Sequence, residues 1–222
     1  MSKLKVSGNA SGTGVITLEA PNTNTDRAIT LPDSAGELIN IAPSTSGNVL
    51  TSDGTDWTSA AAAGGGLYAS VAIICDEKAY NANGGVFTSG AWRTRDLNTE
   101  ISDADGIVSI SSNQFTLAAG TYTIEWSVPQ WKTAVTASRL YNTSDSTVTQ
   151  YGSVEHAAAA ESVMTRSTGS SVFIIAGSKT FEIQHKCATT STPYGFGFAA
   201  NDLGNTEGLV SIYTIVKILK HS

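Results

Sequence analysis

The sequence has few charged residues, and its positive charges are too sparse for a nucleic-acid-binding protein. Charged side chains make up 14% of the 222 residues, and 13 Lys and Arg against 19 Asp and Glu give a net charge of −6. Binding to the phosphate backbone needs clustered positive charge, whereas the basic residues here are scattered. We therefore expect no nucleic-acid partner.

The sequence also lacks a long apolar run. The longest covers about five residues, 71–75, whereas a membrane-spanning helix needs roughly 20. Residues 1–5, Met-Ser-Lys-Leu-Lys, have no apolar core of the kind that a signal peptide contains. We expect a protein that is made in a cytoplasm without export and is not inserted into a membrane.

Cysteine is nearly absent. Cys75 and Cys187 are the only two, and each lies in an apolar stretch that reads as a strand. This setting predicts two buried free thiols, which behave as small apolar side chains. A single disulfide between them is the alternative.

Aromatic residues are missing from the first part of the chain. Of 4 Trp, 7 Tyr and 6 Phe, only Trp57 precedes residue 67. Large apolar side chains build a core, so this part cannot form a sizeable one alone. Short strands are predicted at 15–18, 28–31 and 38–41, and strands this small are stable only when they pair with other copies or a partner. We interpret residues 1–41 as a small β-rich attachment arm.

Residues 42–66 are rich in Gly, Ala and Ser. They end in four alanines and three glycines, at 60–66. This low-complexity composition predicts a flexible linker. An ordered surface loop is the alternative.

Residues 67–222 carry the period-two alternation of apolar and polar side chains that is typical of strands. Strands are predicted at 68–75, 106–111, 121–128, 138–141, 148–154, 171–175, 181–187, 194–199 and 209–219. Many short strands with Gly-rich turns and no amphipathic helix indicate an all-β fold. We predict an antiparallel jelly-roll sandwich for this domain.

The last predicted strand, 209–219, is apolar on both faces. One face can fill the core of its own domain, but the other must be covered as well. In a domain without helices the usual cover is another subunit; the alternative is cover by the same chain. The candidate interface residues are Val210, Ile212, Tyr213, Ile215, Val216 and Ile218.

Residues 115–122, Phe-Thr-Leu-Ala-Ala-Gly-Thr-Tyr, resemble a hallmark of the trimeric jelly rolls of the tumour-necrosis-factor family and the complement globular heads. Those proteins carry a Phe, a short apolar turn and then Gly-x-Tyr at the start of the next strand. The resemblance implies a homotrimer in which strand 209–219 lies beside the three-fold axis.

Other segments resemble tail-fibre and other virion fibre proteins of tailed phages. These segments are 11–18, 28–32, 35–38, 47–54, 92–99 and 179–185. The resemblance implies a trimer with an N-terminal part bound to other structural proteins of the virion, in the tail or the capsid, and a distal knob. The expected location is therefore the virion.

Catalytic and metal-binding patterns are absent from the sequence. There is no Gly-x-Ser-x-Gly elbow, and no His/Cys spacing fits zinc. Residues 103–106, Asp-Ala-Asp-Gly, open like a calcium loop but lack its later acidic ligands, so we interpret them as an acidic turn. Of the three histidines, His221 is in the tail, and His185 shares a strand face with apolar residues, which predicts a core or interface position. We expect no enzyme, cofactor or metal.

Binding is then the expected activity, because loops on a rigid β scaffold carry recognition. The candidate ligand-binding residues are Trp131, Lys132, Tyr151 and His156. Trp131 either stacks on a sugar or protein ligand or caps the core.

The leading hypothesis is a trimeric virion adhesin whose knob binds a glycan or protein of the host surface. The alternative is a capsid decoration protein or head fibre with a structural role, and a hydrolase is a third.

Overall fold

A computed structural model describes residues 11–15, 24, 48–52, 57–61, 66–199 and 208–222. The chain divides into two compact units, Met1–Ala61 and Ala62–Ser222. The strands predicted at 15–18, 28–31 and 38–41 lie outside the described residues, apart from the exposed Val15. The attachment arm therefore stays a prediction.

The first unit contains an antiparallel hairpin of β1 (Asn48–Ser52) and β2 (Trp57–Ala61). Asn48 pairs with Ala61, and Ser52 pairs with Trp57. The hairpin lies inside the stretch 42–66, which the sequence predicts to be a flexible linker, with an ordered surface loop as the alternative. The strands are short, and the Val-Leu pair in β1 is exposed, so no clear period-two pattern marks them.

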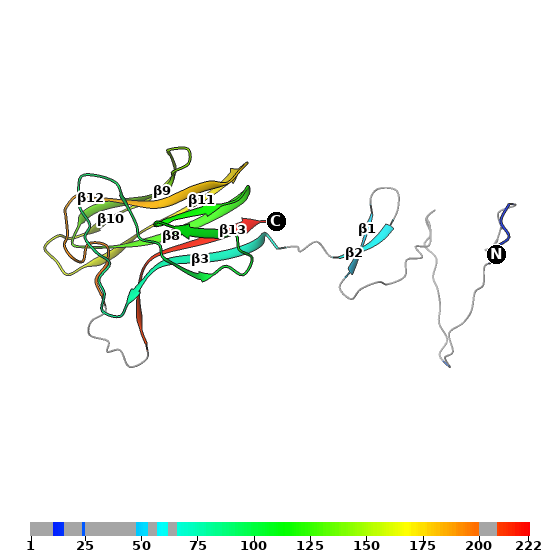
Figure 1. Ribbon diagram of the computed structural model, residues 1–222, viewed down its shortest axis with the longest axis horizontal. Helices are drawn as coiled ribbons and strands as arrows, with labels where there is room; N and C mark the ends of the chain where they lie inside the picture. Colours follow the sequence, from blue (N-terminus) through cyan, green and yellow to red (C-terminus); the bar gives the residue numbers. More distant parts are fainter. Residues whose placement is uncertain (1–10, 16–23, 25–47, 53–56, 62–65, 200–207) are drawn as a thin grey trace, which may run out of the picture. The chain divides into compact units, whose positions relative to one another are not determined.

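The second unit is a sandwich of two antiparallel sheets, and no helix occurs among its described residues (Figure 1). One sheet has the order β11-β8-β13-β3-β5, and the other has the order β10-β9-β12-β7-β6 with β4 paired to β12. The strands are β3 (Tyr68–Ala79), β4 (Arg93–Thr94), β5 (Thr99–Ser102), β6 (Val108–Ser111), β7 (Gln114–Leu117), β8 (Gly120–Trp131), β9 (Ala134–Asn142), β10 (Thr147–Ala157), β11 (Met164–Ile175), β12 (Lys179–Cys187) and β13 (Val210–His221). This confirms the predicted all-β jelly-roll fold.

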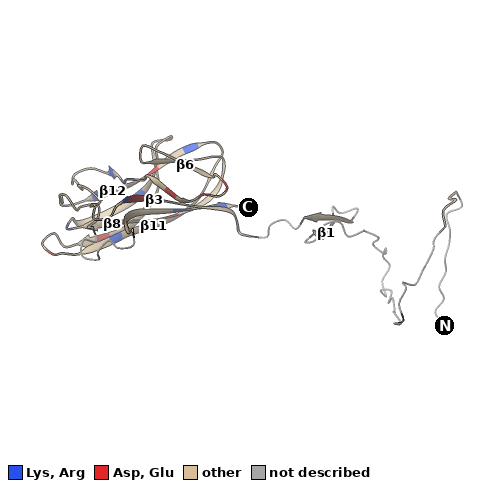
Figure 2. Ribbon diagram, turned by 60° about the horizontal axis from the view of Figure 1, so that its bottom comes forward, with Lys and Arg blue, Asp and Glu red and all other residues tan. Residues whose placement is uncertain are grey.

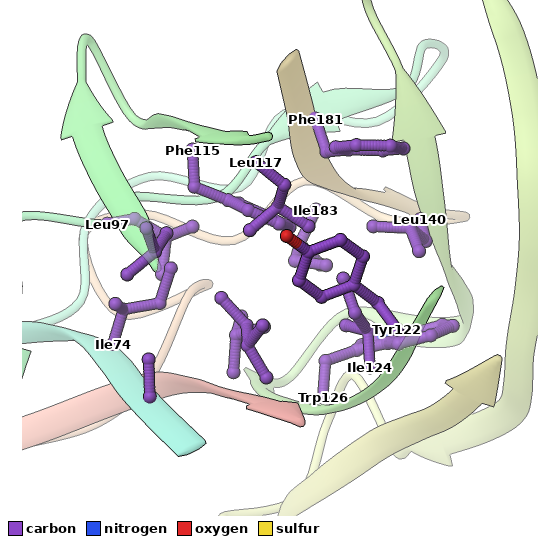
Figure 3. Packing of buried hydrophobic residues seen from close by; sticks show 14 of the residues in the cluster. Ile74, Leu97, Phe115, Leu117, Tyr122, Ile124, Trp126, Leu140, Phe181 and Ile183 are labelled. Carbon is purple, nitrogen blue, oxygen red and sulfur yellow. The ribbon is translucent and has the colours of Figure 1, made fainter. Parts of the chain in front are cut away.

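The core lies between the two sheets. From β8, the alternate residues Tyr122, Ile124, Trp126 and Val128 all point inward and are at most 3% exposed. Figure 3 shows the first three of these facing side chains of the opposite sheet, including Phe181. Burying each such side chain contributes about 1.5–3 kcal/mol before the loss of chain entropy. The alternation read from the sequence thus identifies the inner face of this strand.

A side-chain hydrogen bond closes the turn before β8, within the 115–122 motif. The hydroxyl of Tyr122 donates a 3.2 Å hydrogen bond to the backbone carbonyl of Ala118. The ring itself is fully buried in the core. The tyrosine therefore anchors the start of β8 against the turn that precedes it.

Strand β13 lies in the middle of its sheet, between β8 and β3. Val216 and Ile218 point into the core and have no exposed surface. Tyr213 is 3% exposed, and its hydroxyl donates to the backbone carbonyl of Ala82. These three candidate interface residues are therefore buried within their own chain, and a trimer role for them stays a prediction.

The remaining candidate interface residues face outward. Val210, Ile212 and Ile215 are 48%, 39% and 37% exposed. The pairing of β13 with β3 shifts between Ile212 and Ile215, so the alternation changes phase along the strand. A trimer role for these three residues stays a prediction.

Both cysteines are buried and free, which confirms that prediction. Burial raises the pKa of each thiol to about 11. Both therefore stay protonated at neutral pH, and they act as small apolar side chains.

The two ends of the sandwich differ. At the end that we call the base, Tyr68 pairs with His221, and Ser222 donates a 2.7 Å hydrogen bond to the carbonyl of Gly66. At the opposite end, the tip, β8 terminates at Trp131. The chain enters the sandwich at the base, where β3 begins at Tyr68.

Charged residues are scattered over the described strands and do not gather by sign (Figure 2). No part of the chain that the structure describes forms a helix suited to crossing a membrane.

Candidate ligand pocket at the tip

The four candidate binding residues occupy two separate places. Trp131 ends β8, and Lys132 follows it at the tip. Tyr151 and His156 belong to β10, where they pair with Arg139 and Val135 of β9. The sequence suggested one group of four binding residues. In the fold, two of them lie at the tip pocket and the other two lie on a strand of the six-stranded sheet.

The tip pocket has an aromatic wall. Its lining residues are Trp131, Lys132, Ser162, Ser191, Thr192, Tyr194 and Phe198. The rings of Trp131 and Phe198 stack with centroids 4.6 Å apart and an angle of 24° between their planes. Tyr194 lies 5.1 Å from Phe198. Trp131 is half-buried, so it is part of the wall of an open pocket and does not simply cap the core.

Lys132 sits at a sharp corner where the chain passes from one sheet to the other. Only Lys132 and Thr133 separate β8 from β9. Lys132 has φ of 54° and Ala134 has φ of 56°, which is the left-handed region that favours glycine. Such a conformation persists in other residues only when the surroundings hold it in place.

Hydrogen bonds between buried side chains hold this corner in place from the interior of the sandwich. Thr133 and Gln130 are both fully buried. The hydroxyl of Thr133 donates to Gln130 Oε1 at 3.0 Å, and Gln130 Nε2 donates to Thr165 Oγ1 of β11 at 2.6 Å. The corner that presents Lys132 is therefore fixed by its interior neighbours.

The segment that carries Tyr194 and Phe198 is a series of turns, so the strand predicted at 194–199 was wrong. The two glycines in this segment are positions of close approach. A Cβ on Gly195 would lie 2.5 Å from Cβ of Phe87, and one on Gly197 would lie 2.1 Å from the ring of Tyr213. The alternation of glycine and aromatic residues therefore reflects tight packing of a turn and not the two faces of a strand.

Backbone hydrogen bonds attach this segment to its neighbours. The amide of Trp131 donates to the carbonyl of Gly195 at 3.1 Å, which ties the two walls of the pocket together. The amide of Phe196 donates to Gly85 at 3.0 Å, and the amide of Gly84 donates to Gly197 at 2.9 Å. The aromatic wall is therefore held in a defined position.

Arg95 supports the pocket from the interior. It is fully buried, and its Nη2 donates to the carbonyl of Phe196 at 2.8 Å, while its guanidinium lies 4.0 Å from the centroid of that ring. Further bonds run to Thr214 Oγ1 at 3.0 Å and to the carbonyl of Pro129 at 3.3 Å. Burial lowers the pKa of Arg95 to about 9, so the group stays charged at neutral pH. Sequence reasoning missed this residue because arginine is rarely buried.

His185 occupies a core position, as its strand face predicted. It is fully buried, and its ring centroid lies 4.7 Å from that of Phe87. Neither ring nitrogen has a hydrogen-bond partner. Burial lowers the pKa of His185 well below 6.5, and the positive charge of Arg95 lowers it further. The ring is therefore neutral at pH 7.

Neither Tyr151 nor His156 lines the pocket, and Tyr151 lies next to an aromatic and cationic cluster on the six-stranded sheet. The guanidinium of Arg139 lies 4.2 Å from the ring centroid of Trp92 and 4.9 Å from that of Tyr141. Trp92 in turn is 6.1 Å from Tyr151. A second pocket, whose lining is mostly apolar, borders this cluster, and Trp92, Val135 and Val154 are among its lining residues. Binding roles for Tyr151 and His156 stay predictions.

The acidic turn at 103–106 is a capped turn. The two carboxylate oxygens of Asp103 accept hydrogen bonds from the amides of Ile107 and Val108 at 2.9 and 3.0 Å. Within the described ranges, no group of three or more His, Cys, Asp or Glu residues is arranged to hold a metal ion. The arrangement at the tip instead suits non-covalent binding, with stacking, hydroxyl contacts and one positive charge.

No model of a known protein family matches the sequence, and no curated protein matches it. Solved structures with a similar fold include murine APRIL, with 8% identity over 68% of this chain and 98% of that chain at a TM-score of 0.44. The globular domain of zebrafish complement 1qA has 14% identity over 68% and 96%, at 0.42. The PRD1 vertex protein P5 has 13% identity over 71% and 100%, at 0.41. At such identities the likeness concerns the jelly-roll fold alone, and the resemblance to tail fibres stays a prediction.

Proposed function

We propose that the chain is a non-enzymatic fibre protein of a tailed-phage virion. In this proposal residues 67–222 form the knob of a homotrimer, and residues 1–41 attach it to other virion proteins. The knob binds the host-cell surface through its tip. The observation that supports recognition at the tip is the Trp131–Lys132 pocket, which lies at the end of the sandwich opposite Tyr68, the first residue of β3.

The outer face of the five-stranded sheet supports the homotrimer. Aliphatic residues that are at least 37% exposed occur on four of its five strands, and they are Val71, Ile101, Val172, Ile174, Val210, Ile212 and Ile215. The same face carries one partly exposed ion pair, in which Lys217 Nζ lies 3.5 Å from a carboxylate oxygen of Glu125. An apolar face on an antiparallel sheet is normally covered. Copies of the same chain, meeting around β13, are the proposed cover.

Solution mass and particle location test the assembly. Light scattering on the full chain should give about 69 kDa, which is three copies of 23.0 kDa. A mass of 23.0 kDa would remove the basis for a trimeric knob. Antibody labelling of intact particles should place the chain on the tail; labelling of the capsid lattice would instead support a decoration protein.

Cell binding tests recognition. Fluorescently labelled full chain should bind cells on which the particle grows, and a Trp131→Ala variant with unchanged mass should bind much less. A Val86→Ala variant is the control, because Val86 is 47% exposed and does not line the pocket. Absence of binding to any host cell would refute the adhesin role.

A further inference from the structure

We propose that the tip pocket binds an acidic saccharide, with the sugar against the aromatic wall and its anionic group at the ammonium of Lys132. This inference rests on the proposed function, because it names the ligand class of the same pocket. It is carried by the lining of the pocket and by the backbone conformation of Lys132.

The lining combines two kinds of surface that a sugar needs. Trp131, Phe198 and Tyr194 provide flat apolar rings, on which the C–H face of a pyranose packs. Hydroxyl groups of Ser162, Ser191 and Thr192 provide donors and acceptors for sugar hydroxyls in the same pocket.

Lys132 adds a positive charge at a position where the fold does not need lysine. Glycine or asparagine adopts a φ of 54° at lower cost, so lysine at this corner is disfavoured on conformational grounds. Thr133 and Gln130 maintain the corner through hydrogen bonds of their own side chains, and the lysine side chain has no part in that network. The side chain instead lines the pocket.

The ammonium of Lys132 is also available to a ligand. Among the residues that the structure describes, Lys132 forms no ion pair, and its recorded contact is with the Trp131 ring, 5.8 Å from the centroid. The chain as a whole carries a charge of −6, so general electrostatics would repel an anion. Attraction of an anionic sugar must therefore come from the ammonium of Lys132, which lies beside the aromatic wall of the pocket.

The test uses the full chain and an array of oligosaccharides. The array contains hexuronic acids, nonulosonic acids and sulfated sugars, each beside a neutral counterpart in which the acidic group is reduced or removed. At least one acidic member should bind better than its neutral counterpart by about tenfold, and added salt should reduce this preference. Equal binding of acidic and neutral members, or binding of neither, would overturn the inference.

Two variants assign the effect to the pocket. Lys132→Gly should fold at least as stably as the parent, because it relieves the left-handed lysine, and it should lose the preference for the acidic member. Trp131→Ala should lose binding to both members of the pair. Lys179→Gln is the matched control, because it removes a lysine whose partner is Asp145 and which does not line the pocket. An acidic preference that survives in Lys132→Gly would refute the assignment.

Cell binding separates this inference from the proposed function. If the parent and Lys132→Gly bind host cells equally well, Trp131→Ala does not bind them, and no acidic sugar binds, recognition at the tip stands and the ligand class is wrong. If cell binding is instead abolished by protease treatment of the cells, a protein receptor replaces the saccharide. If no host cell is bound, the adhesin role itself fails.

Discussion

The indole nitrogen of Trp126 donates a 2.8 Å hydrogen bond to Ser138 Oγ, which links β8 in one sheet to β9 in the other. Ser138 Oγ lies 2.7 Å from Ser167 Oγ of β11, and Ser167 Oγ donates to the carbonyl of Ser153 in β10 at 2.6 Å. The chain of bonds crosses the buried space between the sheets where β10 and β11 form their edges. Every polar group in it has a partner, as buried polar groups require.

Removing the central hydroxyl should destabilise the knob. Ser138→Ala leaves the indole N–H of Trp126 buried without an acceptor, which costs about 1–3 kcal/mol in the free energy of unfolding. Urea denaturation followed by tryptophan fluorescence measures this. Ser109→Ala is the control, because Ser109 is exposed in β6 and its loss should change stability by less than about 0.5 kcal/mol. Equal effects of the two variants would contradict the role of the network.

A methyl group at Gly169 should be more damaging. An added Cβ there would lie 2.0 Å from Cζ2 of Trp126, and moving the ring away would disturb the hydrogen bond from its nitrogen to Ser138. Overpacking of this kind costs about 1–3 kcal/mol or more. Gly177→Ala is the matched control, because a Cβ on Gly177 meets nothing within 4 Å. Thermal unfolding of both variants should show a clear loss for Gly169→Ala and little change for Gly177→Ala.

His185 should make the knob sensitive to acid. Its pKa in the folded protein lies well below 6.5, so the unfolded chain binds the proton first. Stability is then complete above about pH 6.5 and falls as the pH drops toward the folded pKa, by at most about 1.4 kcal/mol per pH unit. Denaturant unfolding at about pH 8 and about pH 5.5 measures the difference.

The variant His185→Leu isolates this group. It removes two ring nitrogens that have no partners, so its stability should fall less than that of the parent between the two pH values. Burial raises the pKa of Asp76, which acts in the opposite direction on acidification, but this contribution is common to both proteins. An identical pH dependence in parent and variant would show that His185 is not responsible.

The sandwich was predictable from the sequence because its strands alternate clearly. In β8 the inward positions carry Tyr122, Ile124 and Trp126, while polar residues lie between them, so one face could be assigned without coordinates. Strand β13 could not be assigned in the same way, because both of its faces are apolar. The phase shift between Ile212 and Ile215 decides which residues point inward, and such a shift leaves no mark in the hydrophobic pattern.

The tip pocket was predictable only in part. Trp131 and Lys132 stood out because they follow a clean alternation, which suggested the end of a strand. Tyr194 and Phe198 were assigned to a strand, because alternation with glycine looks the same whether glycine fills a pleat or allows close packing. Arg95 was not identified, since its role depends on partners far away in sequence, such as the carbonyl of Phe196. Local patterns therefore locate elements, whereas convergence of distant segments builds the site.

A charge placed on the outer face of β13 should dissociate the trimer. Ile215→Asp puts a carboxylate at an outward position that is 37% exposed in the single chain, so folding should be little affected. In a trimer the same position would be covered, and an unpaired buried carboxylate costs several kcal/mol. Light scattering should therefore give about 69 kDa for the parent and 23.0 kDa for the variant. The control is Val154→Asp, on the other sheet and 70% exposed, which should remain a trimer. If Ile215→Asp keeps the mass of the parent, this face does not form the subunit contact.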